Sequence, residues 1–395
     1  MIIERDLAPR LLKAAASFPA VTLTGPRQSG KSTLCRHLFP DHKYANLERP
    51  DTREFARDDP KGFLADHARG AIIDEIQHAP ELTSWLQALI DEKPQAGQWI
   101  LTGSQNFSLS ESVSQSLAGR TAVLHLLPLS LNEIERFDTV PDQLDSVMIH
   151  GGYPRIHDQQ IDPTEWAASY VATYLERDVR TLARIVDLSD FQRFLGLCAG
   201  RSGQVLNYSV LASDCGISQP TAKSWLSILE ASFLVHIIPS WSGNIRKRLT
   251  RSPRLIFLDS GLLCWLLGLR TPDHLASHPL RGQIFESWGM AEVIKHRLHA
   301  GETRGLYYYR DHSGLETDLV IEDAGQAHLV EFKAGQTVTR RALTTLTRVQ
   351  QALPPNYVKK MTLVHGGDQN QNRQGIDIRT WQQVPTGCIS CPSAT

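Results

Sequence analysis

Residues 25–32 carry two glycines, a lysine and a serine at the spacing of a phosphate-binding loop. The segment reads Gly25-Pro-Arg-Gln-Ser-Gly30-Lys31-Ser32 and follows a short apolar run. The glycines let the backbone wrap around a phosphate so that successive N–H groups point at it, and the positive end of the next helix points the same way. Lys31 adds a charge for the β- and γ-phosphates, and the Ser32 hydroxyl is placed to ligate Mg²⁺. We therefore predict ATP and Mg²⁺ as cofactors, with contacts from Gly25, Pro26, Arg27, Gln28, Ser29, Gly30, Lys31, Ser32 and Thr33.

A second apolar run, at residues 70–73, ends in two acids, Asp74 and Glu75. Taken with the loop upstream, this pattern predicts that Asp74 holds Mg²⁺ through water. Glu75 would then polarise the water that attacks the γ-phosphate. Without that loop, the same pattern would indicate only a strand that reaches a solvated turn.

Two further positions are candidates for contact with the γ-phosphate. The predicted strand at 99–102 runs into Ser104 and Gln105, and either could act as a sensor if this strand lies between the loop strand and the Asp-Glu strand. An ordinary polar turn fits equally well. Arg120 could be an arginine finger that enters the site of a neighbouring subunit, which predicts a homo-oligomer. A solvated surface arginine is the alternative.

Composition limits the partners and the compartment. The chain of 395 residues has 41 basic and 42 acidic side chains, so any contact with nucleic acid or membrane must come from a local patch. The six cysteines are scattered, which favours a reducing compartment. The amino terminus is charged where a signal peptide would be apolar, and no apolar stretch approaches about 18 residues. We expect a cytoplasmic protein with no membrane partner.

Residues 207–229 have the pattern of a helix-turn-helix. Ala212 stands four residues before Gly216, which favours a tight turn, and Ser218 is placed to cap the second helix. The apolar run at 234–239 then predicts the wing of a winged helix. A DNA contact would use the second helix and the basic stretch that follows it, whose alternatives are a solvated loop or a docking surface for the ATPase domain. The candidate contacts are Lys223, Arg246, Lys247, Arg248 and Arg251, and the same basic stretch continues to Arg254.

A second constellation of acids and a lysine follows in the last third of the chain. Alternation and a turn at 323–326 predict a hairpin that brings Asp318 towards Glu331 and Lys333, which share one face of their strand. This pattern, with Glu286 on an upstream helix, resembles the PD-(D/E)xK nuclease core. The resemblance implies that Asp318, Glu331 and Glu286 hold Mg²⁺ or Mn²⁺ and that Lys333 positions or activates the hydrolytic water. Such cores are also retained as binding scaffolds.

Several short motifs together resemble one family. They are Gly25-Pro-Arg-Gln-Ser-Gly-Lys-Ser, Ile73-Asp-Glu-Ile-Gln77, Leu101-Thr-Gly-Ser104, Leu117-Ala-Gly-Arg120, Pro128-Leu-Ser130, Gly151-Gly-Tyr-Pro154, Tyr174-Leu-Glu-Arg-Asp178 and Phe257-Leu-Asp-Ser-Gly-Leu262. They span nearly the whole chain and are similar to those of prokaryotic AAA+-type ATPases that are usually joined to a C-terminal domain of unknown function. Where Ser-Ser is expected, this chain has Ser104-Gln105.

The predicted architecture is α/β. A parallel sheet of the P-loop NTPase class, AAA+/ASCE type, occupies 1–157; a helical lid or connector, 158–203; a winged helix, 204–255; a PD-(D/E)xK-like α/β domain, 256–383; and a tail, 384–395. The predicted function is that of a Mg²⁺-dependent ATPase associated with nucleic acid, with metal-dependent nuclease activity in its C-terminal domain. The alternative is a nucleotide-switched regulator or defence sensor whose C-terminal domain is a non-catalytic scaffold for protein interaction or oligomerisation.

Overall fold

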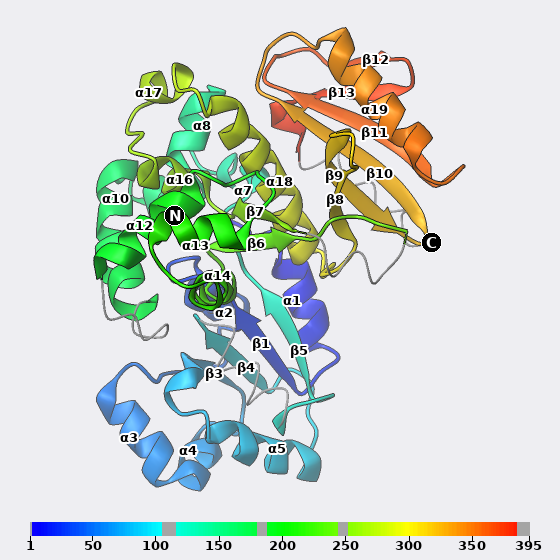
Figure 1. The fold of residues 1–395 in the computed structure, drawn as a ribbon. Helices are drawn as coiled ribbons and strands as arrows, with labels where there is room; N and C mark the ends of the chain where they lie inside the picture. Colours follow the sequence, from blue (N-terminus) through cyan, green and yellow to red (C-terminus); the bar gives the residue numbers. More distant parts are fainter. Residues whose placement is uncertain (1, 105–115, 180–187, 244–251, 385–395) are drawn as a thin grey trace. The chain divides into compact units, whose positions relative to one another are not determined.

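The computed structural model describes residues 2–104, 116–179, 188–243 and 252–384 (Figure 1), with the backbone alone for 176–179. These residues form two compact units. Among the described residues, the first unit contains those within 1–129, 231–233 and 297–301, and the second contains the others.

A parallel five-stranded sheet forms the centre of the first unit. Its spatial order is β2-β3-β4-β1-β5, and every neighbouring pair is parallel. The strands are β1 (Ala20–Thr24), β2 (Lys43–Asn46), β3 (Ala71–Asp74), β4 (Trp99–Gly103) and β5 (Thr121–His125). β1, β3 and β4 are buried along their whole length, which explains why they read as short apolar runs without alternation.

Helices connect these parallel strands and bury both faces of the sheet. They are α1 (Ala8–Ala15), α2 (Lys31–Leu38), α3 (Pro50–Asp58), α4 (Pro60–Asp66) and α5 (Leu82–Glu92). One core contains Leu11, Val21 and Leu34, while a second contains Leu86 and Trp99. β4 lies between β1 and β3, which is the arrangement that the sensor hypothesis for Ser104 required.

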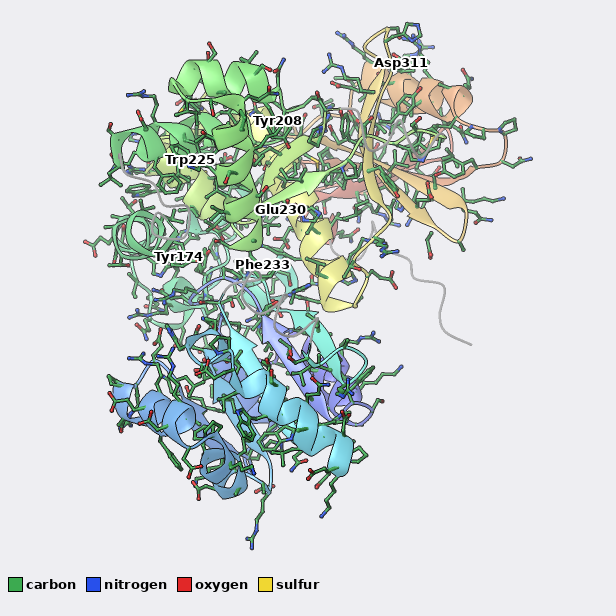
Figure 2. All side chains as sticks on the ribbon, turned by 60° about the horizontal axis from the view of Figure 1, so that its bottom comes forward. Tyr174, Tyr208, Trp225, Glu230, Phe233 and Asp311 are labelled. Atoms are coloured by element: carbon green, nitrogen blue, oxygen red, sulfur yellow. The ribbon has the colours of Figure 1, made fainter. Side chains whose placement is uncertain are left out.

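The second unit begins with a set of helices. They are α7 (Leu131–Ile134), α8 (Leu144–His150), α9 (Pro154–Asp158), α10 (Pro163–Tyr170), α12 (Leu188–Ala199), α16 (Ser260–Leu266) and α17 (Pro272–Ala276). Asp162 caps α10 by accepting hydrogen bonds from the next N–H groups, and a π-helical stretch, Val171–Val179, continues it. The predicted apolar stripe is buried here: Trp166 stacks on Tyr170, and Tyr174 (Figure 2) lies next along the stripe.

Two helices joined by a tight turn follow, with an antiparallel strand pair. α13 (Tyr208–Cys215) ends at Gly216, whose φ of 76° lies in the left-handed region, and α14 is Gln219–Ala231. Trp225 of α14 (Figure 2) contacts Phe191 and Phe194 of α12 edge to face. β6 (Val235–Ile238) pairs with β7 (Arg254–Phe257).

A six-stranded mixed sheet completes the second unit, in the order β12-β13-β11-β10-β9-β8. Its strands are β8 (Leu306–Arg310), β9 (Glu316–Asp323), β10 (Gln326–Lys333), β11 (Val358–His365), β12 (Gln371–Arg373) and β13 (Ile376–Thr380). The predicted hairpin is β9–β10, which turns at Ala324 and Gly325, both with positive φ. α19 (Arg340–Ala352) packs against β9, β10 and β11 (Figure 1).

α18 (Arg281–His299) approaches β10 closely. At Gly289, an added Cβ would lie 2.4 Å from a ring carbon of Phe332, so no larger residue fits there without movement. Glu286 lies about one turn earlier on the same helix, which brings its side chain towards the end of β10.

Candidate functional site

The phosphate-binding loop connects β1 to α2, and its shape depends on its glycines. At Gly25, an added Cβ would lie 2.1 Å from the carbonyl oxygen of Leu126, and Gly30 has a φ of 93° in the left-handed region. The buried guanidinium of Arg5 supports the loop, since it donates to the Ser29 carbonyl oxygen at 2.7 Å and to that of Leu127 at 2.8 Å. Arg5 was missed in the sequence, because nothing in its local spacing indicates this role.

Lys31 is the first residue of α2, and its ammonium lies against the loop. Its Nζ donates to the carbonyl oxygens of Gly25 at 2.9 Å and Pro26 at 2.8 Å. The side chain is buried, and burial lowers the pKa of Lys31 while the charges of Glu75 and Asp74 oppose that shift. The loop therefore holds a cation at its inner face, where the predicted role requires one.

Asp74, at the end of β3, accepts hydrogen bonds from three hydroxyl groups. Ser32 Oγ lies 2.8 Å from its Oδ2, the Tyr44 hydroxyl lies 2.5 Å from the same oxygen, and Thr102 donates to Oδ1. Ser32 and Asp74, the two predicted ligands of Mg²⁺, are thus brought together from separate elements. Oxygen donors of this kind suit Mg²⁺. Burial and the hydrogen bond to Asp74 raise the pKa of Tyr44.

Glu75 has an unusual backbone conformation, and neighbouring groups hold its carboxylate. Its φ of 58° is in the left-handed region, where a residue with a Cβ is strained. Its Oε2 accepts from Ser104 N at 3.3 Å and from Ser104 Oγ at 3.1 Å, and Gln77 donates to the same oxygen. Of the two sensor candidates, Ser104 therefore contacts Glu75, while Gln105 lies outside the described residues.

Arg27 and Arg120 are both engaged with acids of their own unit. Arg27 lies 3.4 Å from Glu48. Arg120 makes two parallel contacts with Asp91 of α5, from Nε at 2.6 Å and from Nη2 at 2.8 Å. The Arg120–Asp91 pair is partly exposed, and a pair of this kind adds little to stability. The role of Arg120 as an arginine finger stays a prediction.

In the second unit, Lys333 lies between two carboxylates. Its Nζ is 2.9 Å from Glu331 Oε1 and 3.2 Å from Glu286 Oε1. The other oxygen of Glu331 accepts from Thr317 Oγ1 at 3.1 Å and from the backbone N–H of Asp318 at 3.3 Å. The hairpin and α18 therefore bring three of the four predicted side chains together.

Asp318 has a different partner from the one predicted. Its Oδ1 lies 3.0 Å from Arg254 Nη1, and its Oδ2 accepts from the backbone N–H of Phe332 at 2.9 Å. Arg254, expected to face a phosphate backbone, is instead buried with 3% of its surface exposed. In the described ranges, Glu286, Asp318 and Glu331 do not bring three carboxylate oxygens within 4.8 Å of one another. Arg254 neutralises the buried Asp318, and the predicted metal shell of Asp318, Glu331 and Glu286 stays a prediction.

Burial and neighbouring charge raise the pKa values of the two glutamates in this cluster. Burial first, and then the charge of Asp318, raises the pKa of Glu286 to about 7 and that of Glu331 to about 8. Burial alone would lower the pKa of Lys333, but the three carboxylates together raise it. One ammonium thus does not compensate both Glu286 and Glu331, and these two side chains suit a divalent cation.

Affinity for Mn²⁺ is expected to rise as the pH is raised from about 6 to about 9, because a proton on Glu286 or Glu331 competes with the cation. The raised pKa values of these carboxyl groups lie in that range, so lowering the pH through them adds protons and weakens binding. Calorimetric titration of the ATP-free protein checks this expectation. Glu331→Gln should remove the part of the pH dependence that comes from Glu331 and leave the part from Glu286, and an affinity that falls with rising pH would contradict the expectation.

The remaining predicted nucleic-acid contacts are only partly described. Lys223 is exposed on α14, with its Nζ 5.3 Å from the ring centre of Tyr208. Arg246, Lys247, Arg248 and Arg251 lie outside the described residues. The basic stretch therefore stays a prediction.

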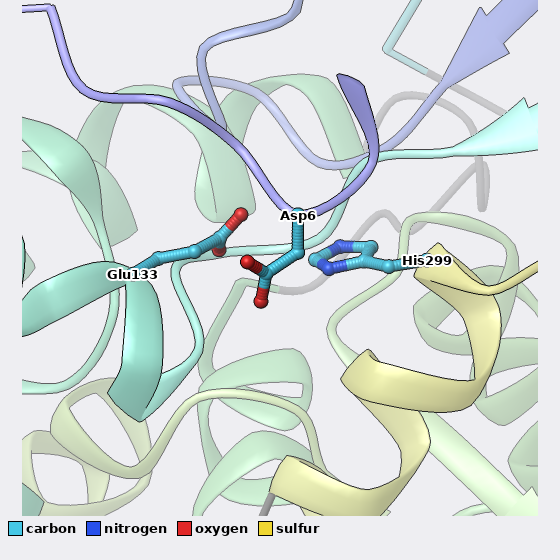
Figure 3. A group of neighbouring side chains, drawn as sticks. All are labelled: Asp6, Glu133 and His299. Carbon is cyan, nitrogen blue, oxygen red and sulfur yellow. The ribbon is translucent and has the colours of Figure 1, made fainter. Parts of the chain in front are cut away.

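Figure 3 shows three further titratable side chains, of which Asp6 and His299 belong to the first unit and Glu133 to the second. Ligand atoms of Asp6 and His299 lie within 4.8 Å of each other. Glu133 Oε2 accepts from Ser130 N at 2.9 Å and so closes the capping box of α7. Two ligands from one unit do not make a cation site.

The parallel sheet carries this loop after β1 and an Asp-Glu pair at the end of β3, with β4 between these two strands. This arrangement defines a P-loop ATPase domain. Residues 17–135 match the family described as AAA domain. Residues 141–273 and 281–388 match two families that are each described as a domain of unknown function, DUF8612 and DUF4143. The chain thus carries an AAA-type ATPase domain, followed by regions that match these two families.

Two mycobacterial proteins, each called an uncharacterised protein, are similar over most of the chain. One is from Mycobacterium tuberculosis and the other from Mycobacterium bovis; each is 30% identical over 358 residues, which cover 89% of this chain and 79% of the relative. The chain belongs to the same family as these two proteins.

Among solved structures, the Walker-type ATPase of Pyrococcus abyssi is 15% identical with a TM-score of 0.38, and the match covers 67% of this chain and 96% of that one. AMPPCP-bound DnaA from Aquifex aeolicus is 12% identical with a TM-score of 0.30, with coverage of 57% and 85%. These scores are too low to bear on function. In the described part of the chain, no helix is both long and apolar enough to cross a bilayer.

Proposed function

We propose that the protein is a Mg²⁺-dependent ATPase that acts in association with nucleic acid. The observation that carries the ATPase proposal is the 2.8 Å hydrogen bond between Ser32 and Asp74, which joins the phosphate-binding loop to the strand that ends in Glu75. Ser32 and Asp74 are the residues that would hold Mg²⁺. Bound with ATP, Mg²⁺ would supply positive charge to the β- and γ-phosphates.

The protein's own groups divide the remaining work. The N–H groups of the loop and the ammonium of Lys31 bind and orient the phosphates. Glu75 takes a proton from the attacking water, and Ser104 and Gln77 hold its carboxylate in one position. Arg120, supplied by a neighbouring subunit, would stabilise charge in the transition state and make the active form an oligomer.

Lys31→Ala is expected to weaken ATP binding about 10- to 100-fold, since charge-assisted hydrogen bonds contribute about 1.5–3 kcal/mol. Titration with a fluorescent ATP analogue measures the change. The control is Lys13→Ala, an exposed lysine on α1, which should leave the affinity unchanged. Thermal unfolding shows whether Lys31→Ala is folded; a folded variant that retains ATP as well as the wild type does would overturn the proposal.

We propose metal-dependent cleavage of phosphodiester bonds as a second candidate activity. It is favoured by the position of Lys333 between Glu286 and Glu331, which could hold Mg²⁺ or Mn²⁺ while Lys333 positions water. The competing assignment is a non-catalytic scaffold in a nucleotide-switched regulator, which the diversion of Asp318 to Arg254 favours. ATP turnover with and without added DNA separates the two, because a scaffold that binds protein predicts turnover indifferent to DNA.

A further inference from the structure

A cleft of about 590 Å³ lies beside Glu331 in the second unit. One wall is α19, and the other comes from the start of β9 and the turn before it. The cleft is lined mostly by polar and charged side chains. Its acids are Glu316 and Glu331, and α19 supplies its cations: Arg340, Arg341 and Arg348.

The periodicity of α19 gathers these arginines on one face. Leu343, Leu346 and Val349 are buried against the sheet, whereas the three arginines are exposed. Their positions, i, i+1 and i+8, place them on the opposite face over about 12 Å of helix axis. No acid among the described residues lies within 4.0 Å of these guanidinium groups.

The hydrogen-bond donors on α19 indicate which kind of ligand the cleft binds. The hydroxyls of Thr344 and Thr345, which also line the cleft, donate to the carbonyl oxygens of Arg340 and Arg341 at 3.0 Å. The guanidinium groups are therefore the donors that face the cleft. Guanidinium groups bind phosphate oxygens in a planar, two-pronged geometry. Cations spread over about two helical turns match successive phosphates along a strand better than one isolated phosphate.

We propose that this cleft binds the sugar–phosphate backbone of a nucleic-acid strand, with Arg340, Arg341 and Arg348 on its phosphates. A strand seated there would pass beside Glu331 and so reach Lys333 and Glu286. The inference deepens the second candidate activity and rests on it only for the position of the bond to be cut. Strand binding itself requires neither cleavage nor ATP.

The test uses the full-length protein, without ATP and with Ca²⁺ in place of Mg²⁺, and a fluorescein-labelled single-stranded DNA followed by anisotropy. The double variant Arg341→Ala/Arg348→Ala should bind at least tenfold more weakly. The slope of log affinity against log salt should fall by about 1.4, since each phosphate contact contributes about 0.7 on a single strand. The control, Lys359→Ala/Arg373→Ala, removes two exposed cations of the same unit that do not line the cleft, and it should bind like the wild type.

Equal binding by the two double variants would overturn the proposal. Displacement of the DNA by inorganic phosphate at the same phosphate concentration would also overturn it, in favour of a single-phosphate site. Displacement by poly-glutamate at matched charge would do so in favour of an acidic protein.

The outcomes separate this inference from the two activities. A wild type that binds DNA through Arg341 and Arg348 but cuts nothing keeps the cleft assignment and removes the nuclease. A wild type that cuts DNA while the arginine variant binds normally removes the cleft assignment alone. ATP turnover without DNA should be unchanged in the arginine variant, and thermal unfolding like that of the wild type shows that its second unit is folded.

Discussion

Replacing Glu75 with glutamine is expected to lower ATP turnover about 10²- to 10⁴-fold, the range in which general base catalysis contributes. Glutamine can keep the hydrogen bonds from Ser104, but it cannot take the proton from the attacking water. The loop and Lys31 are unchanged, so ATP should stay bound. Release of phosphate measures turnover, and titration with an ATP analogue measures binding.

Substitution of another glutamate is the control for Glu75→Gln. Glu92, exposed at the end of α5, can be changed to glutamine with no expected effect on turnover. Ser104→Ala should lower turnover less than Glu75→Gln, because Gln77 still donates to the Glu75 carboxylate. Turnover within about twofold of the wild type in Glu75→Gln would show that another group activates the water.

Lys333→Ala should abolish metal-dependent cleavage of nucleic acid, with a loss of at least about 10²-fold, the lower end of the effect of removing one transition-state donor. The reason is its position, since no other cation is within ion-pair distance of both Glu286 and Glu331 in the described residues. Gel assays with DNA and RNA in Mg²⁺ or Mn²⁺ check the expectation. Binding of labelled DNA, measured in parallel, should be lost far less than cleavage.

Controls distinguish lost chemistry from lost structure in the Lys333 test. Lys359→Ala removes an exposed lysine on the adjacent β11 and should cut as the wild type does. Thermal unfolding of Lys333→Ala shows whether the cluster of acids survives without its cation. If the wild type cuts neither DNA nor RNA with either metal, the nuclease candidate fails and the scaffold becomes the better assignment.

Much of the ATPase site could be predicted because its elements are local. A strand buried on both faces reads as a short apolar run, and a polar residue placed just after such a run lies at the strand end. Asp74, Glu75 and Ser104 were found in this way, and the order of β3, β4 and β1 places them together. The matched AAA domain confirms the class of fold that these runs predicted.

The parts that escaped prediction depend on contacts between distant residues. Arg5 supports a loop that begins 20 positions later, and Tyr44 and Thr102 reach Asp74 from neighbouring strands. The periodicity of the local sequence cannot predict such long-range contacts. In the second unit, alternation correctly paired Glu331 with Lys333, since side chains two apart share a face.

The prediction that the basic stretch is exposed was wrong for its last residue, Arg254, for the same reason. Arg254 reads as one more exposed cation, because its partner, Asp318, is 64 positions away in the sequence. The burial of Arg254 follows from the packing of β7 near β9, which the sequence alone does not give.

The ion pair between Arg254 and Asp318 also bears on how the chain can be divided. A boundary drawn at 255/256, as the sequence suggested, would separate the arginine from its carboxylate and leave Asp318 buried with an uncompensated charge, at a cost of about 3–5 kcal/mol. A fragment that starts at residue 256 would lack Arg254, and it would thus be less stable than the same residues within the whole protein. We therefore expect β7 and the mixed sheet to unfold together.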